Sequence, residues 1–106
     1  MPYPQVPARA EIAESVAVAE ALCYLDDGLP FHAHEVLEQR WRCAPAEEAT
    51  LWKALAQAAA GRTHAARGNP VGEARLRERA ESGIRAYGGR RPDGLRALLE
   101  ALRISP

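Results

Sequence analysis

The sequence lacks an excess of charge of either sign, because its 14 Lys and Arg residues balance 14 Asp and Glu residues. Binding to nucleic acid or to an anionic membrane requires a net basic face that displaces counterions. We therefore expect neither as a partner. Low net charge also gives little repulsion between copies of the chain, so the composition is compatible with a homodimer or another protein partner.

Segments that would direct the chain to a membrane or across one are missing as well. No apolar run approaches the ~20 residues that span a bilayer. The segment Met1–Pro7 has neither the basic region nor the apolar region of a signal peptide. We therefore expect a cytoplasmic protein.

The sequence is also poor in the motifs that identify common enzymes. Its two cysteines, Cys23 and Cys43, have the spacing of neither a zinc ribbon nor a redox pair, and we expect both to be reduced and structural. Nucleotide-binding loops, nucleophile elbows and EF-hand loops are absent from the sequence. Whether the chain is an enzyme therefore stays open.

Apolar residues recur at helical spacing along most of the chain, whereas the alternation typical of strands never persists. Glycine and proline divide this pattern at Gly28 and Pro30 and again at Gly68 and Pro70. The expected helices cover residues 8–26, 30–42, 45–67, 70–86 and 92–102. We predict an all-α, single-domain antiparallel bundle of four to five helices over residues 8–106, after an extended proline-rich arm over residues 1–7.

Chemistry-bearing side chains concentrate in the second expected helix. His34, Glu38 and Trp41 share one stripe, because residues three and four apart are neighbours on a helix surface. Imidazole and carboxylate at this spacing can reach one zinc, manganese or iron ion, with Trp41 as a wall of the pocket. A third ligand must come from elsewhere, and His64 and Glu35 are the candidates.

Two neighbouring groups belong to the same candidate site. His32 and Glu35 form a second pair on a flank of the second helix, where they either extend the site or face solvent. Gln57, Gly61 and His64 share a stripe of the third helix. Glycine inside a helix costs about 1 kcal/mol relative to alanine, so we expect a close helix crossing at Gly61.

Two further interpretations of the motif remain open. In the first, Glu38 accepts hydrogen bonds from His34 and from a donor such as Gln57 or Arg62, and this polar network only fixes the helix register. The chain would then be a non-enzymatic interaction module with hairpins resembling tetratricopeptide repeats. In the second, Glu38 acts as the general base of a metal-free hydrolase or lyase.

The order of these motifs resembles a known family. Residues 34–38 and 41–42 are followed by a long helix with Gln57 and His64, and then by residues 67–69 and a helix start rich in small residues. This order, over roughly residues 20–85, resembles the prokaryotic all-helical domain of unknown function family number three hundred and nine.

The resemblance implies a small helical bundle with no assigned reaction. It also implies metal binding through the family signature, a histidine, three residues, a glutamate, two residues and a tryptophan or tyrosine, met here by His34, Glu38 and Trp41. Ala54 stands where the family has glycine, and Glu73 interrupts a glycine–alanine pair of the family. Both departures change packing and leave the motif intact.

Overall fold

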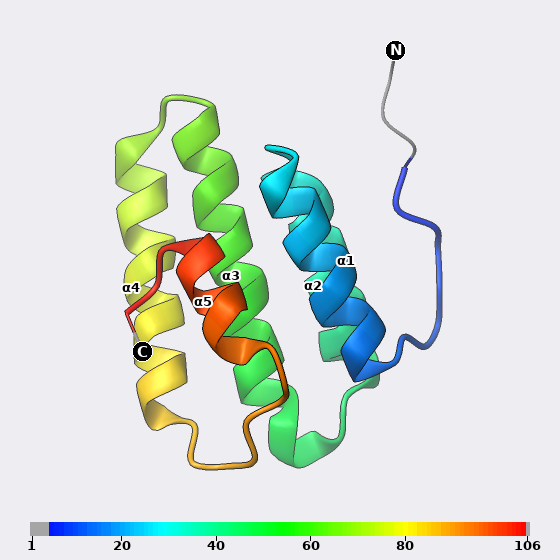
Figure 1. Cartoon of the computed structure of the whole chain (residues 1–106). Coiled ribbons are helices and arrows are strands. Elements are labelled where there is room, and N and C mark those ends of the chain that lie inside the picture. Colours follow the sequence, from blue (N-terminus) through cyan, green and yellow to red (C-terminus); the bar gives the residue numbers. More distant parts are fainter. Residues whose placement is uncertain (1–4, 106) are drawn as a thin grey trace.

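The computed structural model describes residues 5–105, and helices are the only regular elements among them (Figure 1). The elements are α1 (Glu14–Asp26), α2 (Pro30–Cys43), a short 3-10 turn η1 (Ala46–Glu48), α3 (Ala49–Ala66), α4 (Pro70–Ala86) and α5 (Leu95–Leu102). The prediction of an all-α bundle is therefore confirmed. Residues 1–4 of the expected arm lie outside the described part of the chain.

The turns between helices form where glycine and proline predicted them. Gly28 and Gly68 both have a φ of 74°, the left-handed backbone that ends a helix. α2 begins with Pro30 and α4 with Pro70, where a missing N–H is harmless. The Asn69 side chain caps α4 by accepting from the Gly72 N–H at 3.1 Å.

The N-terminal boundary of the first helix differs from the prediction. α1 begins at Glu14, and the segment before it is extended rather than helical from residue 8. Arg9 holds this segment in place, since its guanidinium donates to Glu20 at 2.7 Å and to Gln39 at 2.8 Å. The Ile12 side chain is buried. These long-range contacts outweigh the helix propensity of the alanines.

The last helix is also shorter than predicted. It begins at Leu95, because Gly94 has a left-handed φ of 84° that stops a helix from starting at Pro92. A side chain at position 94 would also collide with Val18. The connection from α4 to α5 therefore passes tightly over α1.

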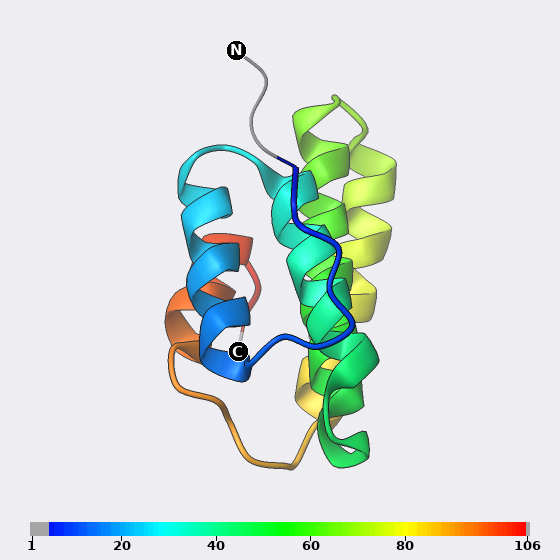
Figure 2. The same ribbon diagram turned by 90° about the vertical axis from the view of Figure 1, so that its right-hand side faces the viewer.

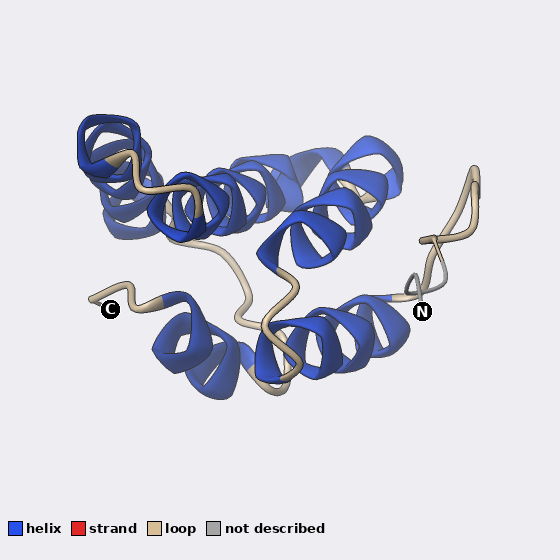
Figure 3. Cartoon of the chain, turned by 90° about the horizontal axis from the view of Figure 1, so that it is seen from above, coloured by secondary structure: helices blue, strands red, loops and turns tan. Residues whose placement is uncertain are grey.

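The helices form two layers (Figures 2 and 3). α3 packs between α2 and α4 in the larger layer, and α1 and α5 cover one face of it. Side chains from both layers fill the core, and the largest that are fully buried include Trp52, Leu37 and Leu98. No described element covers the opposite face of the α2–α3–α4 layer, which we call the outer face.

Small residues set the distance between α3 and α4. A Cβ added to Gly61 would lie 3.4 Å from the Leu76 Cβ, and one added to Gly83 would lie 3.0 Å from the Ala54 Cβ. The close helix crossing predicted at Gly61 is therefore present. Among the described residues, no helix has both the length and the apolar character needed to cross a membrane.

Candidate functional site

His34 and Glu38 lie together on one side of α2. His34 Nε2 is 3.3 Å from Glu38 Oε2. The other carboxylate oxygen, Oε1, pairs with Arg42, one turn further along the same helix. About a quarter of each of the His34 and Glu38 side chains is exposed, 25% and 28% respectively. Both oxygens of Glu38 thus have a partner within α2.

The two nitrogens of the His34 ring differ in their surroundings. Nδ1 is buried and has no hydrogen-bond partner among the described atoms. Nε2 is the nitrogen next to Glu38. A ligand that approaches from solvent can therefore reach only the nitrogen that already contacts Glu38. The ring also lies against Phe31, with 5.9 Å between the ring centroids.

The donor that completes the Glu38 contacts is not one that the sequence suggested. Arg42 pairs with Glu38, whereas Arg62 lies 4.0 Å from Glu73 of α4. Gln57 makes no hydrogen bond to Glu38 and faces a groove between α3 and α4. Arg42 follows Glu38 by four residues, so the two side chains are neighbours on one face of α2 and pair without a partner from another helix.

Trp41 connects the motif to α3. Lys53 Nζ lies 5.7 Å from the centre of the Trp41 ring, within range of a cation–π interaction. His34, Glu38 and Trp41 share a stripe, so this contact places the stripe on the side of α2 that borders α3. The aromatic end of the motif thus faces a cation of the neighbouring helix.

His64 is held in the turn between α3 and α4. Its Nδ1 lies 3.0 Å from Asn69 Nδ2, and Asn69 in turn caps the N-terminus of α4. In residues 5–105, no three His, Cys, Asp or Glu side chains come together as a group that could hold a metal ion. The structure therefore brings His34 and Glu38 together without His64.

The remaining candidates lie around the motif. The His32 ring packs on Tyr24, with 5.2 Å between the centroids. Glu35 and Glu38 line a crevice of about 260 Å³, together with Arg9 of the N-terminal segment. Glu35 is thus near the motif, whereas His32 faces α1.

A second polar network, which the sequence did not reveal, centres on Glu48. The Trp52 Nε1–H donates to Glu48 Oε1 at 3.2 Å, and Arg40 and Arg90 lie 3.8 Å and 3.5 Å from the same carboxylate. Arg40 also donates to the Ile12 carbonyl at 3.1 Å. Glu48 is 7% exposed. This Glu48 network joins α2, η1, α3, the N-terminal segment and the α4–α5 connection.

Tyr87 extends the Glu48 network toward α5. Its hydroxyl donates to the Arg90 carbonyl. Burial raises the pKa of Tyr87 above its usual value, and the negative charge of Glu48 raises it further. The Arg90 side chain also pairs with Glu14, and the hydrogen bond between them raises the pKa of Arg90. The spacing of four residues between Glu48 and Trp52 is the one sequence signal that could have indicated part of this network.

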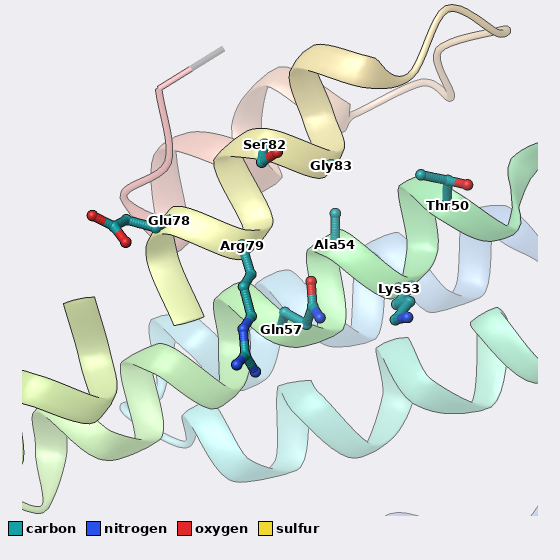
Figure 4. A pocket seen from close by; sticks show the side chains of 8 residues that line it. All are labelled: Thr50, Lys53, Ala54, Gln57, Glu78, Arg79, Ser82 and Gly83. Carbon is teal, nitrogen blue, oxygen red and sulfur yellow. The ribbon is translucent and has the colours of Figure 1, made fainter. Parts of the chain in front are cut away.

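The outer face of the α2–α3–α4 layer carries a groove of about 430 Å³ between α3 and α4 (Figure 4). Its lining residues are Thr50, Lys53, Ala54, Gln57, Glu78, Arg79, Ser82 and Gly83. Lys53 belongs both to this groove and to the Trp41 contact. The motif and the groove therefore adjoin.

Comparison with known proteins agrees with the family resemblance of the sequence. No curated protein and no solved structure matches the chain. The family described as "Domain of unknown function (DUF309)" matches residues 18–76, which is more than half of the chain and includes all of α2 and α3. The chain belongs to this family.

Proposed function

We propose that the chain is a non-enzymatic helical interaction module. His34, Glu38 and Trp41 then serve as a polar network that stabilises α2, and a protein partner binds the outer face. The observation that carries the proposal is that Glu38 contacts two residues of its own helix, His34 at 3.3 Å and Arg42. Contacts at the i, i+4 spacing stabilise a helix, and the Arg42 guanidinium beside Glu38 disfavours the approach of a cation.

The location of the binding surface follows from the layers. α1 and α5 cover only one face of the α2–α3–α4 layer (Figure 3). The outer face offers polar side chains with exposed cations, Lys53 and Arg79, beside the groove. A protein segment with acidic side chains is complementary to these cations. The balanced total charge favours such a partner over nucleic acid, and a cytoplasmic location is part of the same proposal.

Site-specific photo-crosslinking in the native host tests the proposed surface. A photoreactive amino acid replaces Gln57 on the outer face or, as a control, the exposed Ala97 of α5. We expect a discrete crosslinked protein from position 57 and not from position 97. A second copy of the chain as that protein would make the partner a homodimer. Equal crosslinking from both positions, or none from position 57, would refute the surface.

A divalent-metal site for zinc, manganese or iron on His34 and Glu38 is the alternative proposal. In its favour, two ligands bound to a tetrahedral zinc at ~2.0–2.1 Å lie about 3.3 Å apart. His34 Nε2 and Glu38 Oε2 have this separation. Against it, the Arg42 guanidinium repels a cation at Glu38, and the described residues do not bring His64 or Glu35 in as part of a three-ligand group. The donor set is therefore incomplete.

Elemental analysis and a thermal-shift screen with zinc, manganese and iron decide between the two proposals. The network proposal predicts no stabilisation by any of the three metals, and a lower midpoint for His34→Ala that no metal changes. Bound metal at one equivalent, together with a metal-dependent midpoint that His34→Ala abolishes, would establish the metal site instead.

A further inference from the structure

Residues 5–12, which we call the N-terminal segment, lie along α2 as a bound peptide would (Figure 2). Among the described residues, no backbone atom of this segment bonds to another backbone atom. Side chains of α2 hold its backbone instead. Gln39 donates to the Pro7 carbonyl at 2.6 Å, and Arg40 donates to the Ile12 carbonyl at 3.1 Å. The segment is therefore attached through side chains, without the backbone bonds of a helix or a strand.

The Arg9 guanidinium is surrounded by acceptors from two helices. Its Nη1 and Nη2 donate to the two carboxylate oxygens of Glu20 on α1, at 3.0 Å and 2.7 Å. Its Nε and Nη2 donate to Gln39 Oε1 on α2, at 3.0 Å and 2.8 Å. A carboxylate that accepts two bonds beside an amide oxygen matches the planar, forked donors of arginine and not the single point charge of lysine. These two side chains therefore form a site for a guanidinium.

Ile12 is the apolar anchor of the N-terminal segment. Its side chain is buried in the core, and its backbone nitrogen lies 3.5 Å from Cys43 Sγ. Arg9 and Ile12 are three residues apart, so the protein surface contacts an arginine and then an aliphatic side chain at a fixed spacing. The backbone contacts at positions 7 and 12 hold the peptide that carries them.

Charge favours the same kind of occupant. Residues 11–27, which include all of α1, contain five carboxylates and no lysine or arginine. A cationic segment is complementary to this part of the surface. Local opening requires least free energy where backbone hydrogen bonds are few, and release of the N-terminal segment breaks none between backbone atoms of described residues. Release would leave Glu20 and Gln39 available as acceptors.

We propose that the α1–α2 surface, formed by Glu20, Gln39, Arg40 and Cys43, is a second binding site, which residues 5–12 occupy in cis until an extended segment of a protein partner displaces them. The displacing segment carries an arginine and, three residues later, an aliphatic residue. Glu20 and Gln39 bind its guanidinium, and Arg40 binds its backbone. This site goes beyond the outer face, because it lies on α1 and α2 and contacts neither α3 nor α4.

Occupation in cis determines how the site should behave. A ligand tethered by a short linker has an effective concentration of about 1 mM, so the wild-type chain should bind a free segment only weakly. The apparent affinity is lowered by the fraction of chains whose surface is open. A substitution that loosens the N-terminal segment but spares the surface should therefore strengthen binding. General loss of stability would have the opposite effect.

The probe is a fluorescently labelled, capped peptide of residues 5–12, and fluorescence anisotropy measures its binding to the full chain. Arg9→Gln in the chain leaves Glu20 without its guanidinium partner. We expect this variant to bind the peptide about tenfold more tightly than wild type does, the effect of one charge-assisted contact. The same peptide with Arg9→Gln should bind the variant chain at least about tenfold more weakly. No binding of the original peptide to the variant, or equal binding to both chains, would overturn the proposal.

Glu20→Gln in the full chain is the matched control. It breaks the same ion pair from the other side, so it loosens the N-terminal segment as Arg9→Gln does, but it also removes the carboxylate that the peptide needs. We expect no gain in peptide binding, although circular dichroism should show both variants to be folded. An equal gain in both variants would show that the peptide does not use Glu20 and would overturn the site.

A measurement on the wild-type chain needs no variant to fold. Excess unlabelled peptide is added to the isotope-labelled full chain, and NMR follows the backbone amides. Those of Ala8 and Arg9 should move toward the positions of an unfolded chain as the peptide displaces them. Saturable binding that leaves both amides unchanged would place the peptide elsewhere and overturn the proposal. Photo-crosslinking from position 57 reports on the outer face, so each proposal can fail without the other.

Discussion

Replacing Glu48 by glutamine tests which polar network anchors the fold. Glutamine keeps the volume of the side chain and an oxygen that can accept from Trp52, so the substitution removes the charge and replaces one acceptor oxygen with an NH2 group. The Glu48 side chain is 9% exposed and faces two arginines, Arg40 and Arg90. The Arg40 side chain is itself only 12% exposed, and its Nε has no hydrogen-bond partner among the described atoms. Glu48→Gln therefore leaves a desolvated cation without its counter-charge.

The size of the effect follows from that desolvation. Breaking a buried ion pair by removing one partner costs about 3–5 kcal/mol. Arg40 keeps its hydrogen bond to the Ile12 carbonyl and its position over the Trp52 ring, which lowers the expected loss for Glu48→Gln to about 2–3 kcal/mol. The corresponding change at Glu38, whose side chain is 28% exposed, should cost about 0.5–1 kcal/mol.

Urea unfolding followed by circular dichroism measures both losses. Glu48→Gln, Glu38→Gln and wild type are compared near pH 7 with the urea dependence of the unfolding free energy held in common, so that the transition midpoints report stability. Glu47→Gln is the matched control, because Glu47 is exposed on the same 3-10 turn. This substitution removes the same negative charge near the start of α3 but no contact of the Glu48 network. A loss at Glu38 equal to that at Glu48, or a loss at Glu47 as large as either, would refute the reasoning.

Two further predictions concern the α4–α5 connection. Gly94→Ala should destabilise the fold by about 1–3 kcal/mol more than Gly28→Ala. Both positions have left-handed backbone, but only a Cβ at position 94 would also meet Val18, at 2.8 Å. Urea unfolding of both variants checks this, with Val18→Ala as the rescue of Gly94→Ala. The raised pKa of Tyr87 means that its contribution to stability is complete below about pH 10 and is lost as pH rises through the folded-state pKa. Wild type should therefore lose stability above about pH 10 more steeply than Tyr87→Phe in urea titrations at increasing pH.

Helix boundaries could be predicted wherever they are fixed by neighbouring residues. α4 covers Pro70–Ala86 as expected, because a capping asparagine and a first-turn proline determine its start and need no distant partner. The second helix likewise begins at Pro30. In both cases the residue types at the start of the helix favour a helix start by themselves, so the boundary can be predicted from the sequence.

Boundaries that depend on distant contacts could not be predicted. Residues 8–13 have the alanine content of a helix, yet they are extended because Arg9 binds Glu20 and Gln39, which lie 11 and 30 positions away. Arg90 and Glu48 are separated by 42 positions and meet only once α4 has packed on α3. No spacing rule for single helices connects such residues, so the Glu48 network stayed hidden.

The candidate site shows the same division between local and distant information. The pairing of His34 with Glu38 could be predicted from their spacing, and so could their common stripe with Trp41. The partner of Trp41 could not, because Lys53 reaches it from another helix. That contact changes the interpretation of the motif. Its first two residues contact each other within α2, whereas its third packs partly buried against the core and contacts Lys53 of the neighbouring helix. Under the proposed function, therefore, stability and recognition belong to different ends of one motif.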